Sequence, residues 1–382
     1  MTDKSIANLD ALVQALPEAS RERVSRIYRI DTSTGEIKPP PSMRDWIRRQ
    51  FGSLETVQKQ RIVKVTNLIT LEGSLFNELR ASRPMEAGSN DESLLEGINQ
   101  PGDLFCSPLD NTPEDVFGRV RGKHCVTASN VAKCDGFHGL VIFDEHNPLR
   151  FSAEQVADYF DTALQWARMA HCADAEARYF FLLWNCLWRS GASILHGHIQ
   201  MTLTRGIHYA RVEHLRRAAL LYRIAHASDY FDDLFAIHED LGLTARHGQT
   251  RILSHLTPTK EKEVLLLSKC LDDDLKMAVY RILSCFVQQL GVRSFNLALY
   301  MRPIDSVPED WQDFPMVVRI VDRGDLRSKT ADIGAMELYA SSVISSDPFA
   351  VARAVQAAVA PAAPPTACLL YTSPSPRDRT RS

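Results

Sequence analysis

The order in which elements follow one another, repeated once, is the feature of this 382-residue chain that most restricts its fold. Each copy contains an amphipathic helix, an apolar strand, a loop and a second strand. The two copies comprise residues 152–171, 178–188 and 194–204, and residues 272–291, 294–301 and 314–323. Strands joined by a turn pair antiparallel. The sequence therefore predicts an α+β fold of two related halves, with antiparallel sheets flanked by helices.

The rest of the chain divides around these two copies. Residues 1–95 form a predicted helical extension, because 42–51 and 68–82 have helical spacing. The predicted boundaries are 96–215 for a catalytic half, 216–352 for a second, degenerate half and 353–382 for a tail. The end of the tail, 368–382, resembles translated read-through of a sequencing adapter, so it is excluded from the fold prediction.

Composition excludes several classes of protein. The formal charge of −3 gives no basic field for nucleic acid or an anionic membrane. The longest apolar runs are too short to span a bilayer, and the polar start "MTDKSIANLD" lacks a signal-peptide core. The eight cysteines include no CxxC pair, which indicates reduced thiols in a cytoplasmic protein. A homodimer is compatible with this composition.

The segment "ILHGHIQMT", residues 194–202, alternates polar and apolar side chains. On a strand, His196, His198 and Gln200 share one face, and the apolar residues between them face a core. A hairpin in which Trp188 faces Leu195 would also place Asn185 opposite His198.

The loop before this strand suits a phosphate. Gly191 permits close approach of a ligand, and Ser190 and Ser193 offer hydroxyl groups beside exposed N–H groups. A neutral imidazole is a nucleophile at pH 7. The pattern therefore indicates attack of a histidine on phosphorus. A solvated strand face, or a metal bound by the two histidines, are the alternatives.

The segment "NCLWRSGASILHGHIQ" resembles the active-site segment of the histidine-triad superfamily, in the branch of galactose-1-phosphate uridylyltransferase, ADP-glucose phosphorylase and diadenosine tetraphosphate phosphorylase. The matching positions are Asn185, Gly191, Ser193, His196, His198 and Gln200. "NVAKCDGFHGLVIFDEHNPL" is similar to the nucleotide-facing strand of the branch. The resemblance covers roughly residues 100–350 and implies the fold predicted above.

The resemblance also implies roles for these residues. His198 would attack the α-phosphorus, Gln200 would hold a non-bridging oxygen, Ser193 would contact the departing phosphate, and Asn185 would lie at the nucleotide phosphate. Further substrate-binding positions would be Asn130, Lys133, Gly191 and Ser190. The alternative for Lys133 is a solvated surface charge.

A zinc site is implied with a departure from the pattern. His146 and His196 match the two histidine ligands of the uridylyltransferases, but only Cys106 remains of their cysteine pair, and Asp103 replaces the other cysteine. Aspartate is a competent zinc ligand. The alternative is a metal-free phosphorylase in which the lone cysteine only packs.

The second-half strand that would carry histidines in the uridylyltransferases reads "FNLALYMRP", residues 295–303, and contains none, so neither an iron site nor galactose 1-phosphate as substrate is supported. Four basic residues of the second half could bind an acceptor phosphate, or could lie at a charged sheet edge. They are Arg319, Arg323, Arg327 and Lys329.

The predicted function is that of a nucleotidyltransferase or phosphorylase. It would transfer NMP through His198 from a nucleotide sugar or dinucleoside polyphosphate to phosphate or a sugar phosphate. A hydrolase that uses water as acceptor, and a nucleotide sensor without turnover, are the alternatives.

Overall fold

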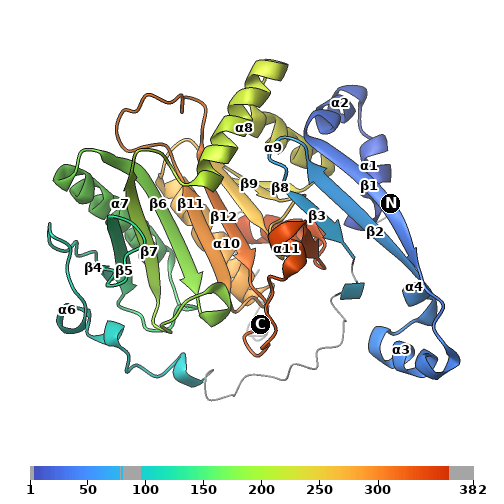
Figure 1. Ribbon diagram of the computed structural model, residues 1–382, viewed down its shortest axis with the longest axis horizontal. Helices are drawn as coiled ribbons and strands as arrows, with labels where there is room; N and C mark the ends of the chain where they lie inside the picture. Colours follow the sequence, from blue (N-terminus) through green and yellow to red (C-terminus); the bar gives the residue numbers. More distant parts are fainter. Residues whose placement is uncertain (1–3, 78, 81–95, 361–382) are drawn as a thin grey trace, which may run out of the picture.

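The computed structural model describes residues 4–77, 79–80 and 96–360. The predicted read-through segment 368–382 lies outside the described residues. Within the described part, a nine-stranded antiparallel sheet has the order β4-β5-β7-β6-β11-β12-β10-β9-β8 (Figure 1). Its strands are β4 (Cys125–Ser129), β5 (Phe137–Phe143), β6 (Ala177–Cys186), β7 (His198–Arg205), β8 (Thr244–His247), β9 (Thr250–Ser254), β10 (Val264–Ser268), β11 (Phe295–Tyr300) and β12 (Met316–Asp322).

Two sets of four strands with the same order make up most of this sheet, and β8 extends the second set at its outer edge. From the outside inwards, the first set runs β4-β5-β7-β6 and the second set runs β9-β10-β12-β11. In both, the third strand in sequence is the innermost, and β6 pairs with β11 across the middle of the sheet. The predicted pair of related α+β halves is confirmed.

Two long helices cover one face of this sheet. Helix α7 (Ala153–Ala173) begins at a capping box formed by Ser152 and Gln155, as the sequence predicts. Helix α10 (Asp273–Gln288) begins at Asp272, whose side chain accepts the backbone N–H of Leu275. The apolar faces of both helices are buried in one core with the strands. His198 and Gln200 of β7 therefore lie on the other face of the sheet, opposite Ile199 and Met201, which are buried in this core.

The N-terminal part contains helices and also a second sheet. Its helices are α1 (Leu9–Gln14), α2 (Glu18–Ile27), α3 (Arg44–Phe51) and α4 (Leu54–Gln58). Strands β1 (Tyr28–Glu36), β2 (Lys59–Asn67) and β3 (Gly73–Phe76) form a four-stranded sheet with β13 (Ser342–Ile344). Residues 68–82 were expected to be helical. For residues 68–77 that expectation is wrong, because 73–76 form strand β3, which pairs with β2 and β13; residues 78, 81 and 82 lie outside the described residues.

The short helix α6 (Pro108–Asn111) precedes β4 in the first half. The later helices pack around the second half, and they are α8 (Ala210–His226), α9 (Tyr230–Leu241), α11 (Ala335–Tyr339) and α12 (Pro348–Val359). Helix α12 extends beyond the predicted boundary at residue 352, and Val355 and Val359 are buried in the core of the nine-stranded sheet. None of the helices in the described part of the chain combines the length and hydropathy that a membrane span requires.

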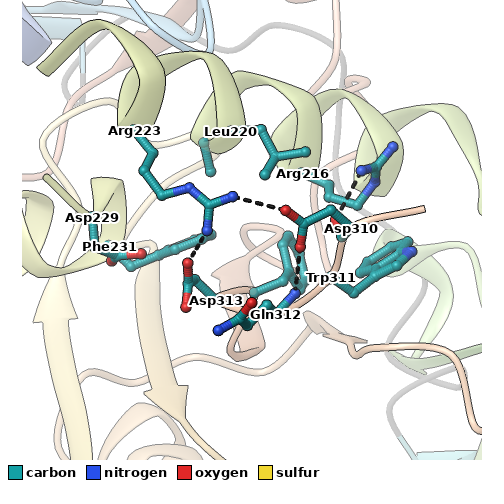
Figure 2. Close-up of a pocket in the computed structure, with 11 residues that line it drawn as sticks. Arg216, Leu220, Arg223, Asp229, Phe231, Asp310, Trp311, Gln312 and Asp313 are labelled. Carbon is teal, nitrogen blue, oxygen red and sulfur yellow. Dashed lines mark hydrogen bonds and ion pairs between the residues drawn. The ribbon is translucent and has the colours of Figure 1, made fainter. Parts of the chain in front are cut away.

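Ion pairs fasten α8 to the loop between β11 and β12. Arg223 binds the carboxylates of Asp310, at 2.8 Å, and Asp313. Arg216 donates to the carbonyl oxygen of Asp310 at 2.9 Å and lies over the ring of Trp311. Figure 2 shows the small pocket that these residues line. Both guanidinium groups of this pocket bind residues of the loop, so their contacts hold the loop against α8.

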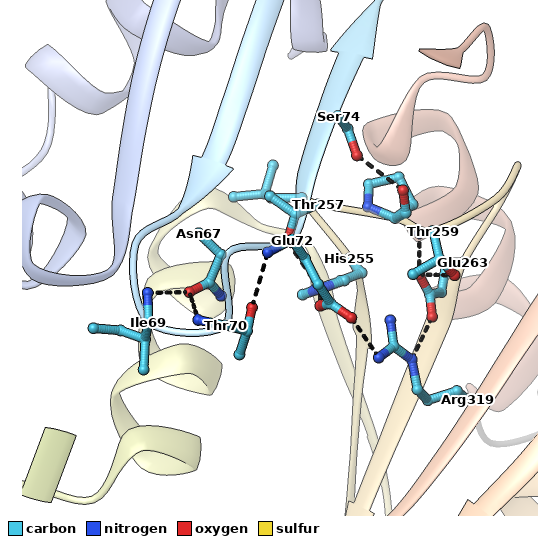
Figure 3. Close-up of polar contacts among 12 residues, drawn as sticks. Asn67, Ile69, Thr70, Glu72, Ser74, His255, Thr257, Thr259, Glu263 and Arg319 are labelled. Carbon is cyan, nitrogen blue, oxygen red and sulfur yellow. Dashed lines mark hydrogen bonds and ion pairs between the residues drawn. The ribbon is translucent and has the colours of Figure 1, made fainter. Parts of the chain in front are cut away.

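A charged network joins the two sheets (Figure 3). Arg319 of β12 binds Glu263 at 2.6 Å and Glu72 of the N-terminal part at 2.7 Å. Burial would raise the pKa of Glu72, but Arg319 and His255 lower it to about 2. Arg319 is thus neutralised by two carboxylates.

The other three basic residues considered for an acceptor site are Arg323, Arg327 and Lys329, and two of them form ion pairs. Arg323 forms a pair with Asp332 at 2.7 Å, and Arg327 with Asp325 at 3.4 Å, while Lys329 is exposed. Of the two alternatives for these four basic residues, the ion pairs favour a charged sheet edge, because a carboxylate binds each of the three guanidinium groups.

Gly139 of β5 provides a test of the packing between sheet and helix. A Cβ at this position would lie 2.6 Å from Cε2 of Trp166 on α7, which is fully buried. We expect Gly139→Ala to lower the free energy of unfolding by about 1–3 kcal/mol, because a rigid ring cannot move aside. Urea denaturation measures this change.

Gly136→Ala is the matched control, because a Cβ there would contact nothing within 4 Å. The control should change the free energy by less than about 0.5 kcal/mol. Equal stability of the two variants would contradict the close packing of α7 on β5.

Candidate active site

His198 is the first residue of β7, and its side chain is oriented by the backbone. Its Nδ1 donates to the carbonyl oxygen of His196 at 2.8 Å, so its Nε2 carries the lone pair. Among the described residues, no hydrogen-bond partner of Nε2 is found. The ring is 6% exposed and packs at right angles against Phe105. Burial lowers the pKa of His198, which keeps the ring neutral and nucleophilic.

Gly197 between the two histidines is required by close packing. A Cβ here would lie 2.4 Å from Cδ2 of Phe143, and the ring of Phe143 is stacked on Tyr159 at 3.8 Å. The glycine N–H also donates to the carbonyl oxygen of His146. The chain therefore enters the sheet at His198, not at residue 194 as expected, and His196 turns away from β7.

Asn185 lies at the boundary between the two halves. Strands β6 and β7 pair Leu183 with Gln200, which is the register that the predicted hairpin requires. This is the last residue pair between the two strands, so Asn185 lies beyond their paired region. In β11, Asn296 is the direct partner of Asn185 and donates to its Oδ1 at 2.6 Å. The second half thus fixes the amide of Asn185. No local pattern in the sequence singles out Asn296, because its partner Asn185 lies 111 residues away.

The loop between β6 and β7 differs from a tight hairpin. A short 3-10 helix, Trp188–Ser190, ends at Gly191, whose φ of 97° requires glycine. The Ser190 hydroxyl is buried and donates to the carbonyl oxygen of Leu187 at 2.7 Å. Ser193 is exposed. Of the two hydroxyl groups proposed for substrate contact, only that of Ser193 is free of a partner among the described residues.

Two predicted substrate-binding residues lie on the loop before β5. Asn130 accepts the N–H of Ala132 and lies beside His138. Lys133 donates to Ser129 at 2.6 Å and pairs at 3.4 Å with Asp115, whose side chain is 4% exposed. The Lys133 ammonium therefore compensates a buried carboxylate, although the lysine side chain itself is 38% exposed.

Asp103, Cys106, His146 and His196 come together, as predicted. Their ligand atoms all lie within 4.8 Å of one another. The two Nδ1 atoms are 3.2 Å apart, and Sγ of Cys106 lies 3.6 Å from Nδ1 of His146 and 3.5 Å from Nδ1 of His196. This cluster contains the donor types and the number of groups that a tetrahedral zinc ion uses.

Backbone carbonyl groups orient both imidazoles of this cluster. Nε2 of His196 donates to Phe143 at 2.7 Å, and Nε2 of His146 donates to Gly97 at 3.3 Å. Two Nδ1 lone pairs then face each other, which is unfavourable unless a cation lies between them. The tautomers therefore fit a metal ion at this position.

Solved structures with this fold include three that are similar over most of their length. An ADP-glucose phosphorylase from Arabidopsis thaliana with bound ADP-glucose has 15% identity and a TM-score of 0.59, covering 76% of this chain and 97% of its own. A GalT-like protein from Arabidopsis thaliana has 15% identity and a TM-score of 0.55, covering 68% and 92%. A uridylyltransferase has 17% identity and a TM-score of 0.53, covering 65% and 88%.

These structures belong to the branch that the sequence resembles, so the resemblance is confirmed at the level of the fold. No family model matches the sequence, and no curated protein matches it. At this identity, the likeness concerns the fold alone.

Lys133→Met tests whether this ammonium is needed by Asp115. We expect a loss of about 1–2 kcal/mol in the free energy of unfolding, because the variant leaves a buried carboxylate without its cation while the partly exposed lysine limits the effect. Chemical denaturation measures the loss.

Lys123→Met is the control, because Lys123 pairs with Glu154 at 3.3 Å on the surface. Its effect should stay below about 0.5 kcal/mol. A Lys133→Met variant as stable as the wild type would contradict the structural role.

Proposed function

We propose that this protein transfers a nucleoside monophosphate through a covalent nucleotidyl-histidine at His198. One observation carries the proposal: the hydrogen bond from Nδ1 to the carbonyl oxygen of His196 leaves the lone pair of Nε2 without a partner among the described residues. A nucleophile of this kind divides one difficult displacement into two easier ones.

In the first step, the Nε2 lone pair forms a bond to the α-phosphorus of the donor. The bond between this phosphorus and the bridging oxygen breaks, and the leaving group takes the electron pair. The leaving group is a sugar phosphate from a nucleotide sugar, or a nucleoside polyphosphate from a dinucleoside polyphosphate. The Nδ1 proton stays on the ring, and the carbonyl oxygen of His196 stabilises the positive charge that develops there.

In the second step, an oxygen of the acceptor phosphate or sugar phosphate attacks the same phosphorus. The bond between phosphorus and Nε2 breaks, and its electrons return to the ring. Gln200 would donate to a non-bridging oxygen in both steps, and loss of such a donor typically costs about 3 kcal/mol. Ser193 would contact the leaving phosphate, and Asn185, fixed by Asn296, would contact the nucleotide phosphate.

The donor proposed is a nucleotide sugar or a dinucleoside polyphosphate. ADP-glucose is bound in the similar phosphorylase from Arabidopsis thaliana, which makes ADP-glucose the first donor to test. The second half offers no histidine in β11 or β12, which does not support galactose 1-phosphate as the acceptor.

We also propose that zinc is bound by Asp103, Cys106, His146 and His196. Four protein ligands make a closed site of the structural type, which supplies binding energy to the fold. The ion would hold the loop of Cys106 beside His196. The backbone carbonyl oxygen of His196 accepts the hydrogen bond from Nδ1 of His198.

The covalent intermediate can be trapped directly. We expect ADP-glucose labelled at the α-phosphate, or labelled UDP-glucose or diadenosine tetraphosphate, to leave an acid-labile label on the protein. His198→Ala should abolish this label and lower turnover by about a thousandfold or more, because the nucleophile is lost.

His226→Ala is the matched control, since His226 is an exposed histidine at the end of α8. It should retain label and turnover. Label that persists in His198→Ala would contradict the proposal. Nucleotide binding without label or exchange in the wild type would indicate a sensor, and release of free NMP alone a hydrolase.

Metal analysis tests the zinc site. The wild type should contain equimolar zinc. Cys106→Ala should weaken zinc binding by more than the roughly 10- to 100-fold typical of outer-shell changes, because it removes a thiolate ligand. Cys270→Ala, at an exposed thiol, should leave the zinc content unchanged. A Cys106→Ala variant with full zinc content would contradict the assignment.

A further inference from the structure

A histidine outside the recognised motif contacts Gln200. His138 lies on β5, on the same face of the sheet as Gln200, and is 4% exposed. Its Nε2 is 3.1 Å from Oε1 of Gln200. His138 lies in the segment that is similar to the nucleotide-facing strand of the family branch, but the resemblance assigns it no role.

The tautomer of His138 follows from its other nitrogen. The backbone N–H of Cys134 donates to Nδ1 at 3.1 Å, so Nδ1 must carry a lone pair. Nε2 of the neutral ring therefore carries the proton and donates it to Oε1 of Gln200. Burial also lowers the pKa of His138, which favours the neutral ring.

This hydrogen bond fixes the orientation of an amide. Once Oε1 of Gln200 accepts from His138, the amide cannot rotate without losing the bond, and the NH₂ group must point away from His138. Without His138, both orientations of the amide would be accessible. Only the orientation with NH₂ turned away from His138 presents a donor to a phosphate oxygen on the His198 face.

We propose that His138 is a positioning residue that holds Gln200 with its NH₂ group directed at a non-bridging oxygen of the phosphate being transferred. The inference rests on the proposed function and assigns to His138 no contact with substrate. Such a residue affects the transition state through the group that it orients, so its loss appears mainly in kcat.

The tautomer of His138 also decides whether the amide of Asn130 is available to a ligand. Its Nδ2 lies 3.2 Å from Nε2 of His138. Because Nε2 is protonated, it has no lone pair for this amide, and the N–H groups of Asn130 remain free for another acceptor. Asn130 was expected near the nucleotide, and a neutral His138 leaves it able to bind there.

Two variants of His138 separate donation from packing. His138→Phe keeps a ring but removes the donor. His138→Gln retains an N–H at a similar distance along the side chain. We expect His138→Phe to lower kcat about tenfold with KM changed less than twofold, and His138→Gln to restore most of the loss. The reaction is phosphorolysis of whichever of ADP-glucose, UDP-glucose and diadenosine tetraphosphate labels the wild type.

A double-mutant cycle tests whether His138 acts through Gln200. In a Gln200→Ala background, His138→Phe should change kcat by less than twofold, because the amide to be oriented is absent. A purely structural role would reduce kcat by the same factor in both backgrounds and would overturn the proposal. Urea denaturation of each variant identifies any loss of the fold.

The tautomer can be measured without a substrate. In a long-range ¹H–¹⁵N spectrum of protein labelled at histidine, the His138 signals, assigned by their loss in His138→Phe, should show a protonated Nε2 and an unprotonated Nδ1. A proton on Nδ1 would overturn the proposal. Failure of the wild type to form a labelled His198 would instead refute the proposed function and leave the tautomer result standing.

Discussion

The contact between Gly197 and the ring of Phe143 decides where both motif histidines lie. Phe143 is stacked on Tyr159 of α7, so the ring cannot withdraw. Because Gly197 has no side chain, the chain passes close over this ring and joins β5 through backbone hydrogen bonds. His196 thereby lies beside Cys106 and Asp103, while His198 begins the strand, and both rings pack against Phe105.

Backbone groups then set the proton on each imidazole of the site. Carbonyl oxygens accept from His198, His196 and His146, and an N–H group donates to His138. Each ring therefore presents a defined lone pair or proton to its neighbours. A site for covalent transfer requires this order, because the same ring in the other tautomer would offer a proton where a lone pair is needed.

The two halves contribute unequally to this arrangement. Asn296 of the second half lies directly opposite Asn185 and holds its amide, while Arg323 also donates to Asn296. Arg319 is bound by Glu263 and Glu72. The named polar residues of the second half therefore brace the sheet and the N-terminal part.

The sequence by itself determined the duplicated α+β order, the helix start at Ser152 and the register of β6 and β7, because these depend on local periodicity, capping and turn position. The grouping of Asp103, Cys106, His146 and His196 was implied by the family resemblance. The sequence did not predict strand β3, the ion pairs of the second-half arginines, or the role of Lys133. Those depend on partners such as Asp115 and Glu72, which are distant in sequence. Tertiary structure alone placed His138 beside Gln200 and Asn296 beside Asn185, because strand order in a sheet is set by long-range pairing that no short segment encodes.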